Sequence, residues 1–134
     1  MNKFDITYES KKRILVVDDD TDMTRLLKVI LEKSGKFEVR TENDALNAVN
    51  AAHEFNPDVV LLDVIMPKMK GGQIAKKIKE SKELMHSKII FFSALLGKSD
   101  TGDTGKIVDG NMRLSKLVSA NNVVTCIEDI LDVR

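Results

Sequence analysis

A chain of 134 residues with 43% hydrophobic content is long enough to bury a core as one domain, and its single cysteine excludes an intrachain disulfide framework. The 21 basic and 21 acidic residues give a formal net charge of zero, which argues against nucleic acid or a membrane surface as the main partner. No stretch approaches the roughly 18 apolar residues of a membrane span, and the start is too polar for a signal peptide. We therefore expect a cytoplasmic protein.

The chain alternates short apolar runs with amphipathic segments after a polar leader over residues 1–12. Runs rich in β-branched and aromatic residues predict five strands, at about 13–18, 37–41, 58–63, 88–93 and 112–116. Apolar residues at helical spacing predict helices after the first, second, third and fifth of these strands. The alternation predicts one α/β domain over 13–134, with a doubly wound, five-stranded parallel sheet and helices on both faces.

The segment 97–110 departs from this regular pattern. It holds four glycines and three aspartates in 14 residues. A fourth helix belongs there by the alternation, yet each interior glycine costs about 1 kcal/mol relative to alanine. We therefore expect a fourth helix that is short or poorly ordered, covering about 105–109.

Acidic residues close two of the buried strands. Asp18 and Asp19 follow one apolar run, and Asp63 follows another. Parallel strands end at the same edge of a sheet, so three carboxylates would meet there and repel one another unless a cation lies among them. Ser93 and Lys116 close two further strands, at the edge where ligands of such sheets bind.

Purely structural roles explain only part of this acidic pattern. Helix capping accounts for Asp20 but not for three consecutive acids. A calcium loop needs glycine at its sixth position and glutamate at its twelfth, where this chain has Met23 and Val29. Asp63 taken alone could be an ordinary turn residue, but its pairing with the first acidic cluster favours a functional site.

These residues resemble the signatures of response-regulator receiver domains. The matching stretches are Leu15–Asp20, Leu61–Pro67, Met69–Gly72, Phe92–Ala94 and Leu114–Lys116. The resemblance covers about residues 12–133 and implies a flavodoxin-like sheet with the strand order 2-1-3-4-5.

The resemblance also implies a role for each site residue. Asp63 would be the phosphoacceptor, and a Mg²⁺ ion would be held by Asp19, Asp63 and the main-chain carbonyl of Ile65, with Asp18 contributing through water. Ser93 would bond a phosphoryl oxygen and Lys116 would pair with the phosphoryl group. A carboxylate held in line with a good donor can form an acyl phosphate, and a divalent ion with a lysine stabilises the transferred charge.

We therefore expect a single-domain response regulator rather than a multiple-turnover enzyme, with no output domain before or after it. It would take phosphate from a histidine kinase or a histidine phosphotransfer protein. It would then signal by phosphorylation-dependent binding to an unidentified protein or by onward phosphotransfer. Two alternatives are a pseudo-receiver, which binds proteins constitutively without cycling phosphate, and a Mg²⁺-dependent hydrolase acting on an external substrate.

Two positions depart from the family pattern. Receivers usually carry proline after the active-site lysine, often through a cis peptide, where this chain has Leu117. Either a cis non-proline bond is tolerated, or the peptide is trans and Lys116 is aimed differently. At a position where an aromatic residue is common, this chain has Arg113 or, if the register shifts by one, Met112. An arginine is costly to bury there, so we expect no aromatic switch and an unusual output face.

Two further positions bear on the lifetime of the phosphoryl group. Ile65 lies two residues after Asp63, and Leu95 lies two after Ser93. In the family these positions influence the attacking water, and apolar side chains cannot orient it. We therefore expect a long-lived phosphoryl group.

Overall fold

The structure is a computed structural model that describes residues 10–108 and 110–132. Most of the predicted leader lies outside these residues, and the first strand already includes Lys12. Every helix in the described ranges is too short or too polar to cross a membrane.

In the described part of the chain, six strands form a single sheet, one more than the sequence predicts. They are β1 (Lys12–Val17), β2 (Phe37–Glu42), β3 (Val59–Asp63), β4 (Lys88–Ser93), β5 (Lys106–Val108) and β6 (Asn111–Ser115). The order is β2-β1-β3-β4-β6-β5, and only the β5–β6 pair is antiparallel. The five parallel strands therefore have the predicted order 2-1-3-4-5, with β6 in the fifth place.

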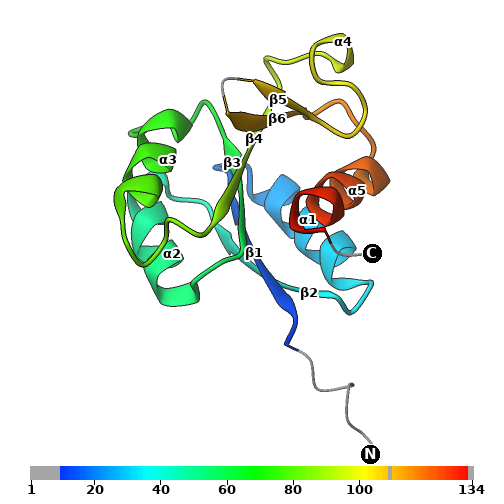
Figure 1. The fold of residues 1–134 in the computed structure, drawn as a ribbon. Helices are drawn as coiled ribbons and strands as arrows, with labels where there is room; N and C mark the ends of the chain where they lie inside the picture. The colour runs from blue at the N-terminus through cyan, green and yellow to red at the C-terminus, as the bar shows by residue number, and fades with distance from the viewer. Residues whose placement is uncertain (1–9, 109, 133–134) are drawn as a thin grey trace, which may run out of the picture.

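Helices cover both faces of this sheet, as predicted (Figure 1). The helical segments are α1 (Thr21–Glu32), a 3₁₀ turn η2 (Ala45–Asn47), α2 (Ala48–Phe55), α3 (Gly71–Glu80), α4 (Lys98–Thr101) and α5 (Ala120–Leu131). Alternate residues of the central strands point into two buried clusters. One cluster packs against α2 and α3, and the other packs against α1 and α5. Cys126 lies fully buried in the second cluster, as its apolar neighbours predict.

The segment 97–110 corrects the sequence prediction. The fourth helix is short, but it is the single turn α4 at Lys98–Thr101, and the predicted helix at 105–109 is wrong because Lys106–Val108 is strand β5. Gly105 has a φ of +99°, which ends any helix before this point and favours glycine. Ile107 and Val108 are β-branched and pair with β6, so the strand gains a partner that the sequence pattern alone does not reveal.

Candidate functional site

The predicted acidic residues meet at one edge of the sheet. Asp18 and Asp19 follow β1, and Asp63 is the last residue of β3. One carboxylate oxygen from each lies within 4.8 Å of the other two. Asp18 and Asp63 are buried and Asp19 is exposed, so the cluster opens to solvent on one side. An all-oxygen set of this kind suits a hard divalent cation.

Lys116 completes the cluster. Its Nζ lies 2.6 Å from Oδ2 of Asp18 and 3.3 Å from Oδ1 of Asp63. The described residues contain no cis peptide, so the bond between Lys116 and Leu117 is trans. Of the two alternatives, the structure therefore has the trans bond, and through it the lysine reaches both carboxylates. Its main-chain N–H donates to the carbonyl of Ser93 at 3.0 Å, which fixes the start of the loop that carries it.

Burial and charge shift the titration of the two central groups. Burial raises the pKa of Asp63, the negative charge of Asp18 raises it further, and Lys116 only partly offsets both. For Lys116, burial lowers the pKa, but the hydrogen bond and charge of Asp18 and the charge of Asp63 outweigh burial and raise it. The lysine therefore stays charged, while the fold disfavours the ionised form of Asp63.

The remaining predicted residues surround Asp63. Ser93 is buried at the end of β4, where the preceding residue, Phe92, pairs with Asp63 across the sheet. Its Oγ accepts the N–H of Leu95 at 3.0 Å, which leaves the hydroxyl proton available for donation. The N–H of Ile65 donates to the Asp63 carboxylate, and the Ile65 side chain is exposed.

The backbone at the start of α3 approaches the end of β3 so closely that position 71 requires glycine. A Cβ atom at Gly71 would lie 2.2 Å from the main-chain oxygen of Asp63, well inside any real contact. The N–H of Gly71 also donates to the carbonyl of Val64 at 3.0 Å. The start of α3 is thereby held directly against the end of β3, where the candidate phosphoacceptor lies.

Asn43 supports the acidic cluster, although its part in the site was not predicted. Its Nδ2 donates to the main-chain oxygen of Asp18 at 2.8 Å and to Oγ1 of Thr24 at 2.9 Å. Asn43 directly follows β2, at the edge where the predicted site residues follow their strands. The rule that polar residues at the ends of parallel strands gather at one edge could therefore have predicted Asn43 as well.

Two buried hydroxyl groups tie α4 to the strand that precedes Lys116. The Oγ of Ser115 donates to the carbonyl of Leu96 at 2.6 Å. The N–H of Ser115 donates to Oγ1 of Thr101 in α4 at 3.3 Å. These bonds connect the segment after Ser93 to the segment that positions the lysine.

Comparison with known proteins identifies the family. The family model described as response regulator receiver domain matches residues 14–128. The polar-differentiation response regulator DivK of Brucella anthropi is 30% identical over 122 residues, which cover 90% of this chain and 96% of that protein. A probable transcriptional regulator, ycf27, of Guillardia theta is 36% identical over 91 residues, but these are 68% of this chain and only 34% of that longer protein.

A solved structure agrees in fold. The crystal structure of a CheY-like response regulator receiver domain protein from Methanospirillum hungatei matches with a TM-score of 0.76 and 25% identity, covering 92% of this chain and 95% of that one. The family match, the DivK relative and the acidic cluster at the strand ends agree with one another. The chain therefore belongs to the response regulator receiver domain family.

Proposed function

We propose that this receiver domain works in two-component signalling by accepting a phosphoryl group on Asp63 from a histidine kinase or a histidine phosphotransfer protein. The observation that carries this proposal is the contact of one lysine with two clustered carboxylates, 2.6 Å from Asp18 and 3.3 Å from Asp63. An ion pair that served stability alone would need one carboxylate, and the additional acids raise the electrostatic cost.

The acidic cluster fits Mg²⁺. Asp18, Asp19 and Asp63 offer carboxylate oxygens within 4.8 Å of one another, and opposite ligands of an octahedral Mg²⁺ are about 4.2 Å apart. Small side-chain movements would bring these oxygens into range, with the main-chain carbonyl of Ile65 as the further predicted ligand. When bound, the ion would offset charge on the carboxylates and on the phosphoryl oxygens.

The protein's own residues have separate parts in the transfer. An Asp63 carboxylate oxygen forms a bond to phosphorus as the phosphorus–nitrogen bond of the donor's phosphohistidine breaks, and the imidazole nitrogen leaves with the bonding electron pair. Lys116 turns from the carboxylates to the new phosphoryl oxygens, because these carry more charge. Ser93 donates its hydroxyl proton to one of those oxygens.

A structural change caused by phosphorylation would be transmitted to α4 through hydrogen bonds of the site. If Ser93 turns toward a phosphoryl oxygen, its bond from the N–H of Leu95 changes. The next residue, Leu96, accepts the bond from Ser115. We therefore expect hydrogen exchange in 97–110 to change on phosphorylation, which fits signalling through a protein partner. Unchanged exchange across this segment would contradict that route.

Intact mass after incubation with Mg²⁺ and acetyl phosphate tests the proposal. We expect one phosphoryl adduct that requires Mg²⁺ and is absent from Asp63→Asn. Asp44→Asn is a matched control, because Asp44 is an exposed aspartate that caps the turn η2. An adduct that persists in Asp63→Asn would reject Asp63 as the acceptor. If neither acetyl phosphate nor a phosphorylated histidine donor gives an adduct, the result would favour the pseudo-receiver.

A further inference from the structure

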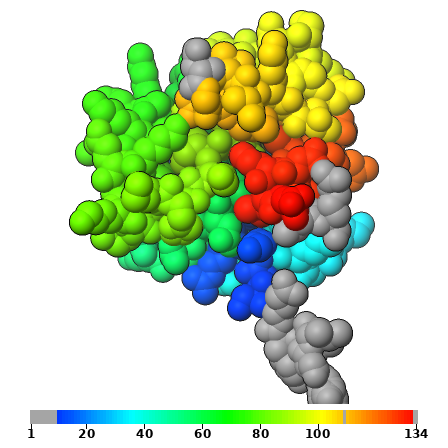
Figure 2. Space-filling model, viewed as in Figure 1, coloured from blue at the N-terminus to red at the C-terminus, as the bar shows by residue number. Residues whose placement is uncertain are grey.

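A groove lies between α3 and the edge of the sheet, on the face that α2 and α3 cover. It has a volume of about 460 Å³ and lies between residues of α3 on one side and of β4 and β6 on the other. In Figure 2, the segment of α4 and β5 forms the yellow-to-orange part of the surface, beside α3 in green. The single turn of α4 contacts the end of β6 at Ser115, and Asn111 and Arg113 of the same strand line the groove.

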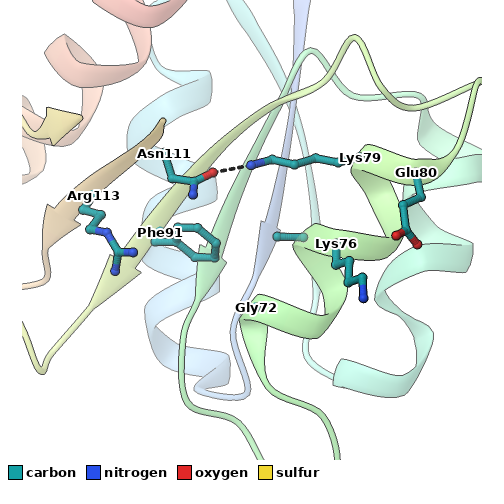
Figure 3. Close-up of a pocket in the computed structure, with 8 residues that line it drawn as sticks. Gly72, Lys76, Lys79, Glu80, Phe91, Asn111 and Arg113 are labelled. Carbon is teal, nitrogen blue, oxygen red and sulfur yellow. Dashed lines mark hydrogen bonds between the residues drawn. The ribbon is translucent and has the colours of Figure 1, made fainter. Parts of the chain in front are cut away.

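The floor of the groove is apolar and its sides are basic. Figure 3 shows Phe91 lying between Arg113 of β6 and the helix α3. The Cζ of Arg113 lies 5.6 Å from the centre of the Phe91 ring, a cation–π contact. Lys76 and Lys79 project from α3, and among the described residues of the lining Glu80 is the one acidic side chain. These described residues thus place three cations against one carboxylate, in a chain whose formal net charge is zero.

The cations of the groove are not neutralised by the described parts of the chain. Lys79 donates to the side-chain oxygen of Asn111, a neutral acceptor, and this bond spans the groove (Figure 3). Within residues 10–108 and 110–132, the structure gives neither Lys76 nor Arg113 a carboxylate partner. The Nε of Arg113 is buried with no hydrogen-bond acceptor in that same region. A buried donor without an acceptor is unfavourable, so this side chain would gain by turning onto an external anion.

We propose that this groove binds an acidic, partly apolar peptide segment of a partner protein. Carboxylates of the peptide would pair with Arg113 and Lys76, and an apolar side chain would pack on Phe91 in place of water. The groove has room for more than a small anion, with about 460 Å³ beside the apolar face of Phe91, and this favours a polypeptide with both carboxylates and an apolar side chain. The proposal concerns the unphosphorylated protein, so it does not depend on phosphate transfer to Asp63.

NMR titration of the nitrogen-15-labelled protein tests this proposal with two decapeptides. One alternates glutamate with leucine, and the control replaces each glutamate with glutamine. We expect the acidic peptide to shift the Arg113 Nε–H signal and the amide signals of Ala75 and Asn111. We expect the neutral peptide to bind at least about tenfold more weakly, because a hydrogen bond between two charged groups is stronger than one with a neutral partner. Equal responses to both peptides, or no response to the acidic one, would overturn the proposal.

Two pairs of variants locate the site. Arg113→Gln should weaken the acidic peptide about tenfold or more, and Arg25→Gln should change its affinity less than about twofold, because Arg25 is an exposed arginine of α1. Lys76→Gln and Lys33→Gln form a second pair of exposed lysines, and only Lys76 lines the groove. Equal losses of peptide affinity within either pair would show that the peptide is attracted by overall charge and does not bind in the groove. Saturation of the same signals by N-acetylglutamate at equal carboxylate concentration would show a small-anion site instead.

Discussion

The two adjacent glycines at the start of α3 give a sharp test of how the site is built. Gly71→Ala would place a Cβ atom 2.2 Å from the main-chain oxygen of Asp63, and real Cβ contacts are essentially never shorter than 3.0 Å. Backbone must move to open this distance, because both atoms belong to rigid parts of β3 and α3. Such overpacking typically costs 1–3 kcal/mol, and with main chain on both sides we expect about 3 kcal/mol.

Gly72→Ala is the matched control. A Cβ atom at Gly72 would meet nothing within 4 Å. Alanine within a helix is more stable than glycine by about 0.5–1 kcal/mol, because glycine loses more backbone entropy on folding. Neighbouring, identical substitutions should therefore change the free energy of unfolding in opposite directions, with a difference of about 3–4 kcal/mol between them.

Urea unfolding followed by circular dichroism measures both variants. Thermal melts of the same variants should give two melting temperatures that differ by about 12 °C. Gly71→Ala should also weaken Mg²⁺ binding, since the displaced atom belongs to Asp63. A Gly71→Ala protein within about 0.5 kcal/mol of the wild type would refute the close approach between α3 and β3.

Three further predictions concern single side chains. In EDTA, Asp63→Asn should raise the free energy of unfolding near neutral pH, because the fold raises the pKa of Asp63 and so disfavours its ionised form. The gain should disappear as the pH falls through that raised pKa toward about 4, and thermal melts showing the same gain at both pH values would contradict it. Ile65 and Leu95 are both exposed, and polar substitutions there should speed loss of the phosphoryl group because polar side chains can orient the attacking water. Intact mass measured over time reports this loss, and an unchanged decay rate would reject the prediction. Burial raises the pKa of the Cys126 thiol to about 11, so folded protein should resist alkylation at neutral pH until urea unfolds it, and rapid labelling without urea would show that this part of the core opens.

The sequence predicts the main architecture because the relevant signals are local. Buried strands read as apolar runs, and helices read as amphipathic periods, so the β/α alternation follows from neighbouring residues. Polar residues at strand ends also predict the acidic cluster, because parallel strands bring those ends to one edge. Asp18, Asp19 and Asp63 lie together in the structure for this reason.

The contact of Lys116 with the carboxylates depended on more than the sequence pattern. The absence of proline after Lys116 left its direction open, and the structure shows the lysine reaching Asp18 and Asp63 through a trans peptide. The bonds of Ser115 to Leu96 and Thr101 hold the residue just before Lys116 in place. These partners are 14 and 19 residues away in the chain, so no local pattern could reveal them.

Outside 97–110, local patterns in the chain predict the order of helices and strands, the buried faces and the edge where the acids gather, because the spacing of apolar residues reports burial. Three features depend on the folded arrangement instead: the structure of 97–110, the contact of Gly71 with Asp63, and the position of Arg113. In each case the outcome depends on the distance between segments that are far apart in sequence. Strand β5 forms because β6 is beside it, and Arg113 lies on Phe91 because the two residues are partners in the β4–β6 pair. No pattern of neighbouring residues predicts strand pairing and side-chain packing of this kind, so they become evident only in the folded structure.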